Sequence, residues 1–165
     1  MKKIFVLSVG RSDYDRYYPI LSELNKNNKV NLFLYLSKVH QNRTFGKTIK
    51  FVNKKFKILR KKYKSNNFRK IETRKEIINN FSDDLLFLSE EIKKKKPDLL
   101  IVLGDRYEML IGPLAAAPYN IPVIHFFGGA VTEGDIDELI RHSITKMSHF
   151  HFVALEQYKK RIIQL

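Results

Sequence analysis

Two largely apolar runs, each followed at once by glycine, constrain the fold of this chain more than any other feature. The first run, Leu99–Leu103, ends in Gly104-Asp105-Arg106, and the second, Ile121–Phe127, ends in Gly128-Gly129. A short continuous apolar run is typical of a strand that is buried on both faces of a parallel sheet. Ligands of open α/β sheets bind beyond the carboxyl ends of such strands. The two runs therefore predict a binding crevice at one edge of a sheet.

Other strand-like and helix-like segments alternate along the chain, which favours an α/β fold. Further strands are expected at Lys3–Val9, Val30–Leu36, Phe56–Leu59 and Phe150–Ala154. Helices are expected from the first strand to about Asn25 and over Arg74–Lys95, Tyr107–Ala117, Ile136–Ser148 and Leu155–Leu165. Asp135 and Glu138 form a capping-box pattern before the fourth of these helices. Regular alternation predicts a Rossmann-like, doubly wound parallel sheet with right-handed crossovers.

Length and composition indicate one domain over residues 1–165. The chain has 165 residues and 44% hydrophobic content, enough for one ordinary core. It has no cysteine, which excludes disulfides and cysteine zinc sites and fits a cytoplasmic location. No apolar run is long enough to suggest a membrane span. The last helix ends without a stop signal, so we expect that the chain is cut short and that a second domain is missing.

The net charge of +14 comes from two local basic patches. Eleven lysines and arginines lie between Lys54 and Lys75, and Lys93–Lys96 adds four more. The first patch contains Phe56, Tyr63 and Phe68, as an RNA-binding or membrane-surface segment can. No recognisable nucleic-acid motif accompanies it, so a solvated lysine-rich excursion is the favoured interpretation. We therefore expect neither a nucleic-acid nor a membrane partner.

The polar segments after the strands resemble a known family. The motifs are Gly104-Asp105-Arg106-x-Glu108, His125-x-x-Gly128-Gly129 and Val131-Thr132-Glu133-Gly134, followed by Ile140-Arg141-His142-x-Ile144-Thr145-Lys146. Together with Arg11-Ser12-Asp13-Tyr14 they resemble the amino-terminal half of the UDP-N-acetylglucosamine 2-epimerases, with the hydrolysing branch matching best. The resemblance implies the first domain of a two-domain glycosyltransferase-B-type fold, with a UDP-sugar bound between the domains. It also implies a homo-oligomer when the protein is complete.

The resemblance implies roles for ten residues. Elimination of UDP and inversion at C2 need carboxylates near the sugar and cations near the diphosphate. The catalytic candidates are Asp105, Asp137 and Glu133. The candidates for substrate binding are Arg11, Asp15, Arg106, Gly128, Gly129, Arg141 and His142. No cofactor is implied, and no metal site is expected because His149 and His151 have no third ligand in view.

One departure from the family pattern leaves a second interpretation open. Where the family usually has a glutamate close to the two glycines, this chain has Phe127 and Ala130. Neither side chain can transfer a proton. Glu133 or a carboxylate of the second domain could replace that group; otherwise the chain is a catalytically degenerate domain that still binds nucleotide sugars. Loss of one acid or base reduces the rate by roughly 10²–10⁴-fold, so this residue pair separates the two interpretations.

Overall fold

The computed structural model describes residues 1–41, 48–52, 56–59, 73–133 and 136–165. These residues form a six-stranded parallel sheet in the order β3-β2-β1-β4-β5-β6. The strands are β1 (Lys2–Ser8), β2 (Val30–Leu36), β3 (Lys57–Leu59), β4 (Leu99–Leu103), β5 (Val123–Phe126) and β6 (Phe150–Phe152). The helices are α1 (Arg11–Lys26), α2 (Lys38–Gln41), α3 (Arg74–Lys95), α4 (Ile111–Ala116), α5 (Ile136–Lys146) and α6 (Glu156–Gln164). Short 3₁₀ turns are η1 (Thr48–Phe51), η2 (Tyr107–Leu110) and η3 (Ala117–Tyr119).

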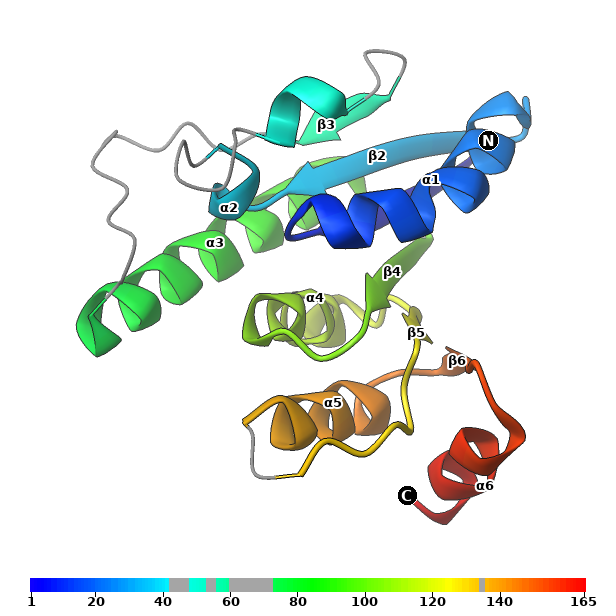
Figure 1. The fold of residues 1–165 in the computed structure, drawn as a ribbon. Helices are drawn as coiled ribbons and strands as arrows, with labels where there is room; N and C mark the ends of the chain where they lie inside the picture. Colours follow the sequence, from blue (N-terminus) through cyan, green and yellow to red (C-terminus); the bar gives the residue numbers. More distant parts are fainter. Residues whose placement is uncertain (42–47, 53–55, 60–72, 134–135) are drawn as a thin grey trace.

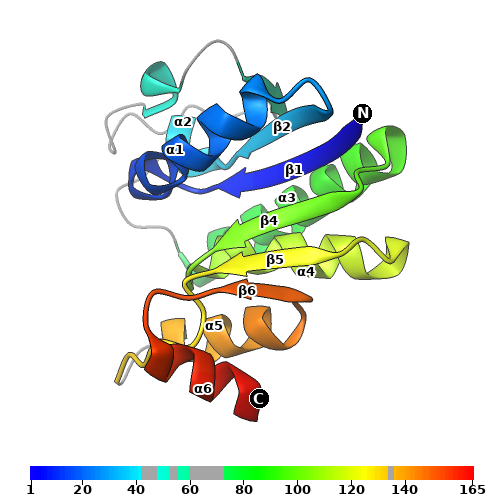
Figure 2. The same ribbon diagram turned by 90° about the vertical axis from the view of Figure 1, so that its right-hand side faces the viewer.

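Helices cover the sheet from both sides. Helices α3, α4 and α5 lie on one face, α1 lies on the other, and α6 lies beside the β6 edge (Figures 1 and 2). The chain leaves β1 on one face of the sheet and β4 on the other, although these two strands are paired. The Rossmann-like, doubly wound fold expected from the sequence is confirmed. Its strand order places a topological switch point between the carboxyl ends of β1 and β4.

The sheet interior is apolar on both faces, as parallel strands require. Phe5, Leu34, Leu100 and Val102 are fully buried within it. Gly112 of α4 lets that helix approach the sheet, because an added Cβ would lie 2.6 Å from Val102 Cγ1. This packing fixes where the strands end and hence where their following loops meet. None of the described helices is long and apolar enough to cross a membrane.

Most predicted boundaries agree with the structure, and two differ for clear reasons. The helix expected over 107–117 is instead η2, α4 and η3 in succession, a segment in which Pro113 and Pro118 cannot donate a backbone N–H. The strand expected over 121–127 is only Val123–Phe126. Pro122 cannot donate at its start, and Phe127 leaves the strand with a φ of 62°. Asp135 and most of the basic segment 54–75 lie outside the described residues.

Candidate active site

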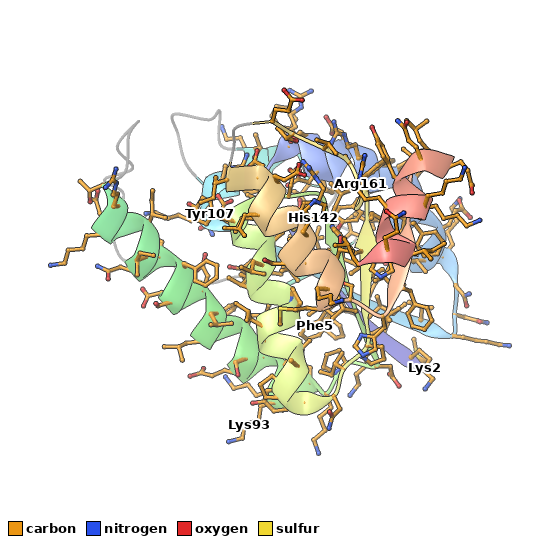
Figure 3. All side chains as sticks on the ribbon, turned by 90° about the horizontal axis from the view of Figure 1, so that it is seen from below. Lys2, Phe5, Lys93, Tyr107, His142 and Arg161 are labelled. Carbon is orange, nitrogen blue, oxygen red and sulfur yellow. The ribbon has the colours of Figure 1, made fainter. Side chains whose placement is uncertain are left out.

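The polar residues predicted from the sequence gather at the carboxyl edge of the sheet. Arg11 begins α1 directly after β1, and Asp105 and Arg106 follow β4. The glycine loop follows β5, and α5 carries Arg141 and His142 back along the same edge. Figure 3 shows His142 on α5 near the middle of the view, away from Lys2, which marks the amino end of β1. Residues from four separate segments therefore gather at the carboxyl edge of the sheet, next to the switch point.

A buried arginine links three of those segments. The Arg141 side chain is only 4% exposed and forms an ion pair with the Asp105 carboxylate. It also donates to the Ala130 carbonyl at 3.0 Å, the Thr132 hydroxyl at 2.8 Å and the Glu138 carboxylate at 3.3 Å. The side chains of Asp105 and Glu138 are 32% and 30% exposed. Arg141 thus supports the two carboxylates from inside the protein while leaving them accessible to a ligand.

Glu138 is a central member of this network, although sequence reasoning assigned it only to a helix cap. Its carboxylate accepts from the Thr132 backbone N–H at 2.5 Å and lies 3.0 Å from His142 Nε2. The Thr132 N–H, followed by the His142 hydrogen bond, holds the pKa of Glu138 below its ordinary value. The spacing of Glu138 to Arg141 and His142, three and four residues, places the three side chains on one helix face. That spacing was the signal available in the sequence.

The two other predicted carboxylates lie at the start of α5 and in the loop before it. Asp137 is half-buried in the first turn of α5. Glu133 is exposed in a turn that precedes the helix. Arg141 bonds to the carboxylates of Asp105 and Glu138. Within the described residues, the geometry therefore groups Asp105 with Glu138 most directly.

The predicted phosphate-side residues are exposed near the first strand. Arg11 forms an ion pair with Asp15 at 3.3 Å, and both side chains are about 60% exposed. The Arg11 guanidinium also lies 4.9 Å from the centre of the Phe51 ring. Arg106 pairs with Glu108 at 3.2 Å and is 47% exposed. Because an exposed pair such as Arg11–Asp15 contributes little to stability, Arg11 can exchange its carboxylate partner for a ligand anion at small cost. The Glu108 side chain is only 12% exposed, so Arg106 is held more firmly.

The two glycines expected to admit a sugar have internal packing roles. Gly128 and Gly129 are both buried. A Cβ on Gly128 would lie 2.9 Å from His125 Nδ1, and a Cβ on Gly129 would lie 2.5 Å from the Tyr158 carbonyl oxygen. Gly129 also has a φ of 79°, which a residue with a side chain rarely adopts. Close packing against β5 and α6 accounts for both glycines without a ligand.

His125 is a buried structural histidine near the end of β5. Its Nε2 lies 2.8 Å from the Gly104 carbonyl and its Nδ1 lies 3.2 Å from the Thr145 hydroxyl. Burial lowers the pKa of His125 to about 4. The ring is therefore neutral at pH 7, with Nε2 donating to Gly104 and Nδ1 accepting from Thr145. Through these two hydrogen bonds, His125 connects the loop after β4 to α5.

The turn between β1 and α1 is held by two buried polar side chains. Asp13 is buried and accepts from the backbone N–H groups of Val9 and Gly10, both at 3.1 Å. His40 is also buried and lies 2.9 Å from the Ser8 hydroxyl. Burial lowers the pKa of His40 to about 4, so it too is neutral at pH 7. These contacts fix the start of α1, where Arg11 lies.

The described residues contain no group of three side chains placed to hold a metal ion. His149 accepts from the Val123 backbone N–H through Nδ1 at 3.2 Å. His151 instead lies beside His125, with ring centres 6.3 Å apart. The two histidines considered as a metal pair thus have different surroundings.

The fold and the crevice define a Rossmann-like domain of the glycosyltransferase-B type. A family model described as UDP-N-acetylglucosamine 2-epimerase matches residues 22–165, and the chain belongs to that family. It is 38% identical to a Campylobacter jejuni protein named GDP/UDP-N,N'-diacetylbacillosamine 2-epimerase (hydrolyzing), over 99% of this chain and 42% of the relative. It is 36% identical to the Escherichia coli polysialic acid biosynthesis protein P7, over 100% of this chain and 42% of the relative.

Solved structures show the same fold. The UDP-GlcNAc 2-epimerase from Neisseria meningitidis bound to UDP-GlcNAc superposes with a TM-score of 0.76 at 24% identity. That match covers 99% of this chain and 43% of the solved chain. The present chain therefore spans about two fifths of the length of the relatives it matches. The expected family and fold class are confirmed.

Proposed function

We propose that this chain is the nucleotide-sugar-binding half of a hydrolysing UDP-N-acetylglucosamine 2-epimerase. The observation that carries the proposal is the Arg141 network, which holds Asp105 and Glu138 as two partly exposed carboxylates at the switch point of the sheet. Membership of the epimerase family supports a UDP-sugar as the ligand. The reaction releases UDP and leaves an N-acetylmannosamine-type sugar of the kind used in sialic acid synthesis.

The chemistry assigns distinct tasks to the groups in the crevice. A carboxylate removes the weakly acidic proton from C2 while UDP leaves from C1, and water then adds to the resulting glycal. In this proposal Asp105 exchanges this proton, with Asp137 and Glu133 as further acid or base candidates. Arg11 and Arg106 stabilise the charge that develops on the departing diphosphate. His142 and Glu138 line the sugar side of the crevice.

We also propose that a second domain completes the site. The side chains of Asp105 and Glu138 are about one third exposed, and the relatives are more than twice as long as this chain. The isolated chain then binds the nucleotide sugar but does not turn it over. A homo-oligomer is expected only for the two-domain form.

A chimeric enzyme tests this function. Residues 1–165 would be joined to the portion of the Campylobacter jejuni relative beyond the matched 42%. UDP released from UDP-GlcNAc is the readout. We expect release by the chimera and at least a ~10²-fold loss on Asp105→Asn, because one acid or base contributes about that much. Asp98→Asn is the matched control, since Asp98 pairs with Lys2 at the opposite end of the sheet. Release that survives Asp105→Asn contradicts the assignment.

A degenerate binding domain is the second candidate, favoured by Phe127 and Ala130. Both residues are apolar and lie within three residues of each other on the loop after β5. Ala130→Glu in the same chimera separates the candidates. Activity that appears only in Ala130→Glu supports degeneracy, whereas activity of the chimera without that change excludes it.

A further inference from the structure

Phe127 has a backbone conformation that few bulky residues adopt. Its φ is 62°, in the left-handed region that favours glycine. The other described non-glycine residues with positive φ are Lys96, which caps α3, and Asn120, which ends η3. Two hydrogen bonds hold the chain around Phe127: its own N–H donates to the Phe152 carbonyl, and the Gly104 N–H donates to the Phe126 carbonyl, both at 2.8 Å. The surrounding sheet therefore maintains a strained residue at the carboxyl edge, where strain often accompanies function.

This conformation places an aromatic ring at the surface of the crevice. Phe127 is 40% exposed, whereas the preceding residue, Phe126, packs against Tyr17 and Phe152. The Arg16 guanidinium of α1 lies 5.8 Å from the centre of the Phe127 ring. A cation at this distance from an aromatic face is an attractive contact that orients the ring. Phe127 is thus an exposed, oriented aromatic group rather than a core residue.

The neighbours of Phe127 indicate which part of a nucleotide sugar it meets. On the α1 side are the cations Arg16 and Arg11, suited to a diphosphate. Beyond Gly128 and Gly129 the chain enters the loop that Arg141 holds to Asp105. In the strand order, β4 lies between β1 and β5, so Asp105 after β4 lies between the α1 side and Phe127 after β5. A sugar whose C2 lies at Asp105 and whose diphosphate lies near α1 then extends its ring toward Phe127.

We infer that Phe127 is a substrate-binding residue whose ring packs against the pyranose of the bound nucleotide sugar. This inference rests on the proposed function and deepens it by assigning the sugar contact. The C–H groups on one face of a pyranose form an apolar surface, and an aromatic face is complementary to it. A carboxylate at this position could transfer a proton, which Phe127 cannot do. Phe127 instead contributes affinity for the sugar part of the ligand.

Affinity measurements on the 165-residue chain test the contact. Isothermal titration calorimetry would compare UDP-GlcNAc with UDP for Phe127→Leu and Phe127→Tyr. Phe127→Leu should weaken UDP-GlcNAc binding about three- to tenfold, which is the range of one aromatic contact, and should leave UDP binding unchanged. Phe127→Tyr keeps the ring and should bind both ligands as the unaltered chain does.

A fluorescent variant supplies a second readout. The chain has no tryptophan, so Phe127→Trp introduces a single reporter at the proposed contact. Its emission should change on addition of UDP-GlcNAc and much less with UDP. Phe150→Trp is the matched control. Phe150 is 55% exposed at the amino end of β6, whereas Phe127 lies at the carboxyl edge of the sheet, so the emission of Phe150→Trp should not respond to the ligand.

The outcomes separate this inference from the proposed function. If UDP and UDP-GlcNAc lose affinity equally in Phe127→Leu, or if neither loses any, the sugar contact is wrong while nucleotide binding stands. A Phe127→Trp emission that is unchanged at saturating UDP-GlcNAc also overturns it. If the unaltered chain binds neither ligand, the proposed function itself fails.

Discussion

At the scale of single residues, the chemistry of the crevice depends on a guanidinium that water does not reach. Arg141 meets two carboxylates, a hydroxyl and a carbonyl, which together use the forked arrangement of its donors. A buried charge is tolerated only when it is paired and fully hydrogen-bonded. Arg141 therefore supports the ligand-facing carboxylates from inside the protein. The expectation from the sequence that Arg141 binds the substrate directly remains a prediction.

Replacement of Arg141 by lysine tests this supporting role. A lysine keeps the charge but cannot reach the four acceptors with one ammonium group. We expect Arg141→Lys to lower the free energy of unfolding by about 1–3 kcal/mol, measured by urea denaturation. Arg11→Lys is the control, because its ion pair is about 60% exposed, and it should change stability by less than ~0.5 kcal/mol. Equal effects in the two variants would show that Arg141 is not a structural centre.

The buried histidines predict how stability depends on pH. Burial lowers the pKa of both His125 and His40 to about 4, against about 6.5 when the chain is unfolded. Between these values the unfolded chain binds protons that the folded chain does not. Stability should therefore be complete above about pH 6.5 and fall as the pH drops toward 4, by about 2–3 kcal/mol for each histidine.

Urea unfolding at about pH 7.5 and pH 4.5 measures this dependence. His125→Gln should reduce the difference in stability between the two pH values by about half, because His40 still contributes. A native state whose stability does not vary over this pH range would contradict the neutral, buried state of His125.

At the scale of elements, the loop after β5 is fixed by the helix that ends the described chain. The Gly129 carbonyl accepts from the Arg161 guanidinium at 2.5 Å, and Gly129 packs directly beneath Tyr158 of α6. Arg161 and His142 lie on neighbouring helices in Figure 3. Helix α6 has no fully buried residue, so its position depends on contacts of this kind. The glycine loop and α6 should consequently respond together to a change in either.

A pair of glycine variants tests this coupling. Gly129→Ala combines a φ of 79° with a Cβ placed 2.5 Å from the Tyr158 carbonyl, whereas Gly104→Ala has a φ of 75° and no atom within 4 Å of its Cβ. Gly104→Ala should lower the free energy of unfolding by about 1–2 kcal/mol through backbone strain alone. Gly129→Ala should lower the free energy of unfolding by more than Gly104→Ala does, and it should increase amide exchange in α6. Equal losses of stability in the two variants, with unchanged amide exchange in α6, would contradict the coupling.

The elements also show what could and could not be predicted from sequence. Helix α3 and strand β4 have the predicted bounds, because each has a long or uninterrupted apolar pattern. The role of Glu138 depends on its distance to Thr132, which only the folded loop determines. The left-handed backbone of Phe127 is likewise set by pairing with Phe152 of β6, a residue 25 positions away. The periodicity of apolar residues predicts where helices and strands lie, but it does not predict the contacts between loops.

At the scale of the whole molecule, the strand order explains why separate motifs form one crevice. Strands β1 and β4 are adjacent in the sheet yet lie almost 100 residues apart, and their following helices leave on opposite faces. Arg11 and Asp105 are thereby placed on two sides of a switch point. The same topology places the amino ends of the strands, including the Lys2–Asp98 pair, at the far edge. Ligand binding should therefore be confined to one edge of the sheet.

The most direct test of the central claim is a ¹H–¹⁵N NMR titration of the 165-residue chain with UDP-GlcNAc. Our account predicts saturable shifts in the amides that follow β1, β4 and β5 and in those around His142, with none at the Lys2–Asp98 edge. Absence of shifts at millimolar ligand would contradict the account. Shifts confined to residues 54–75 would also contradict it and would favour a basic binding module instead.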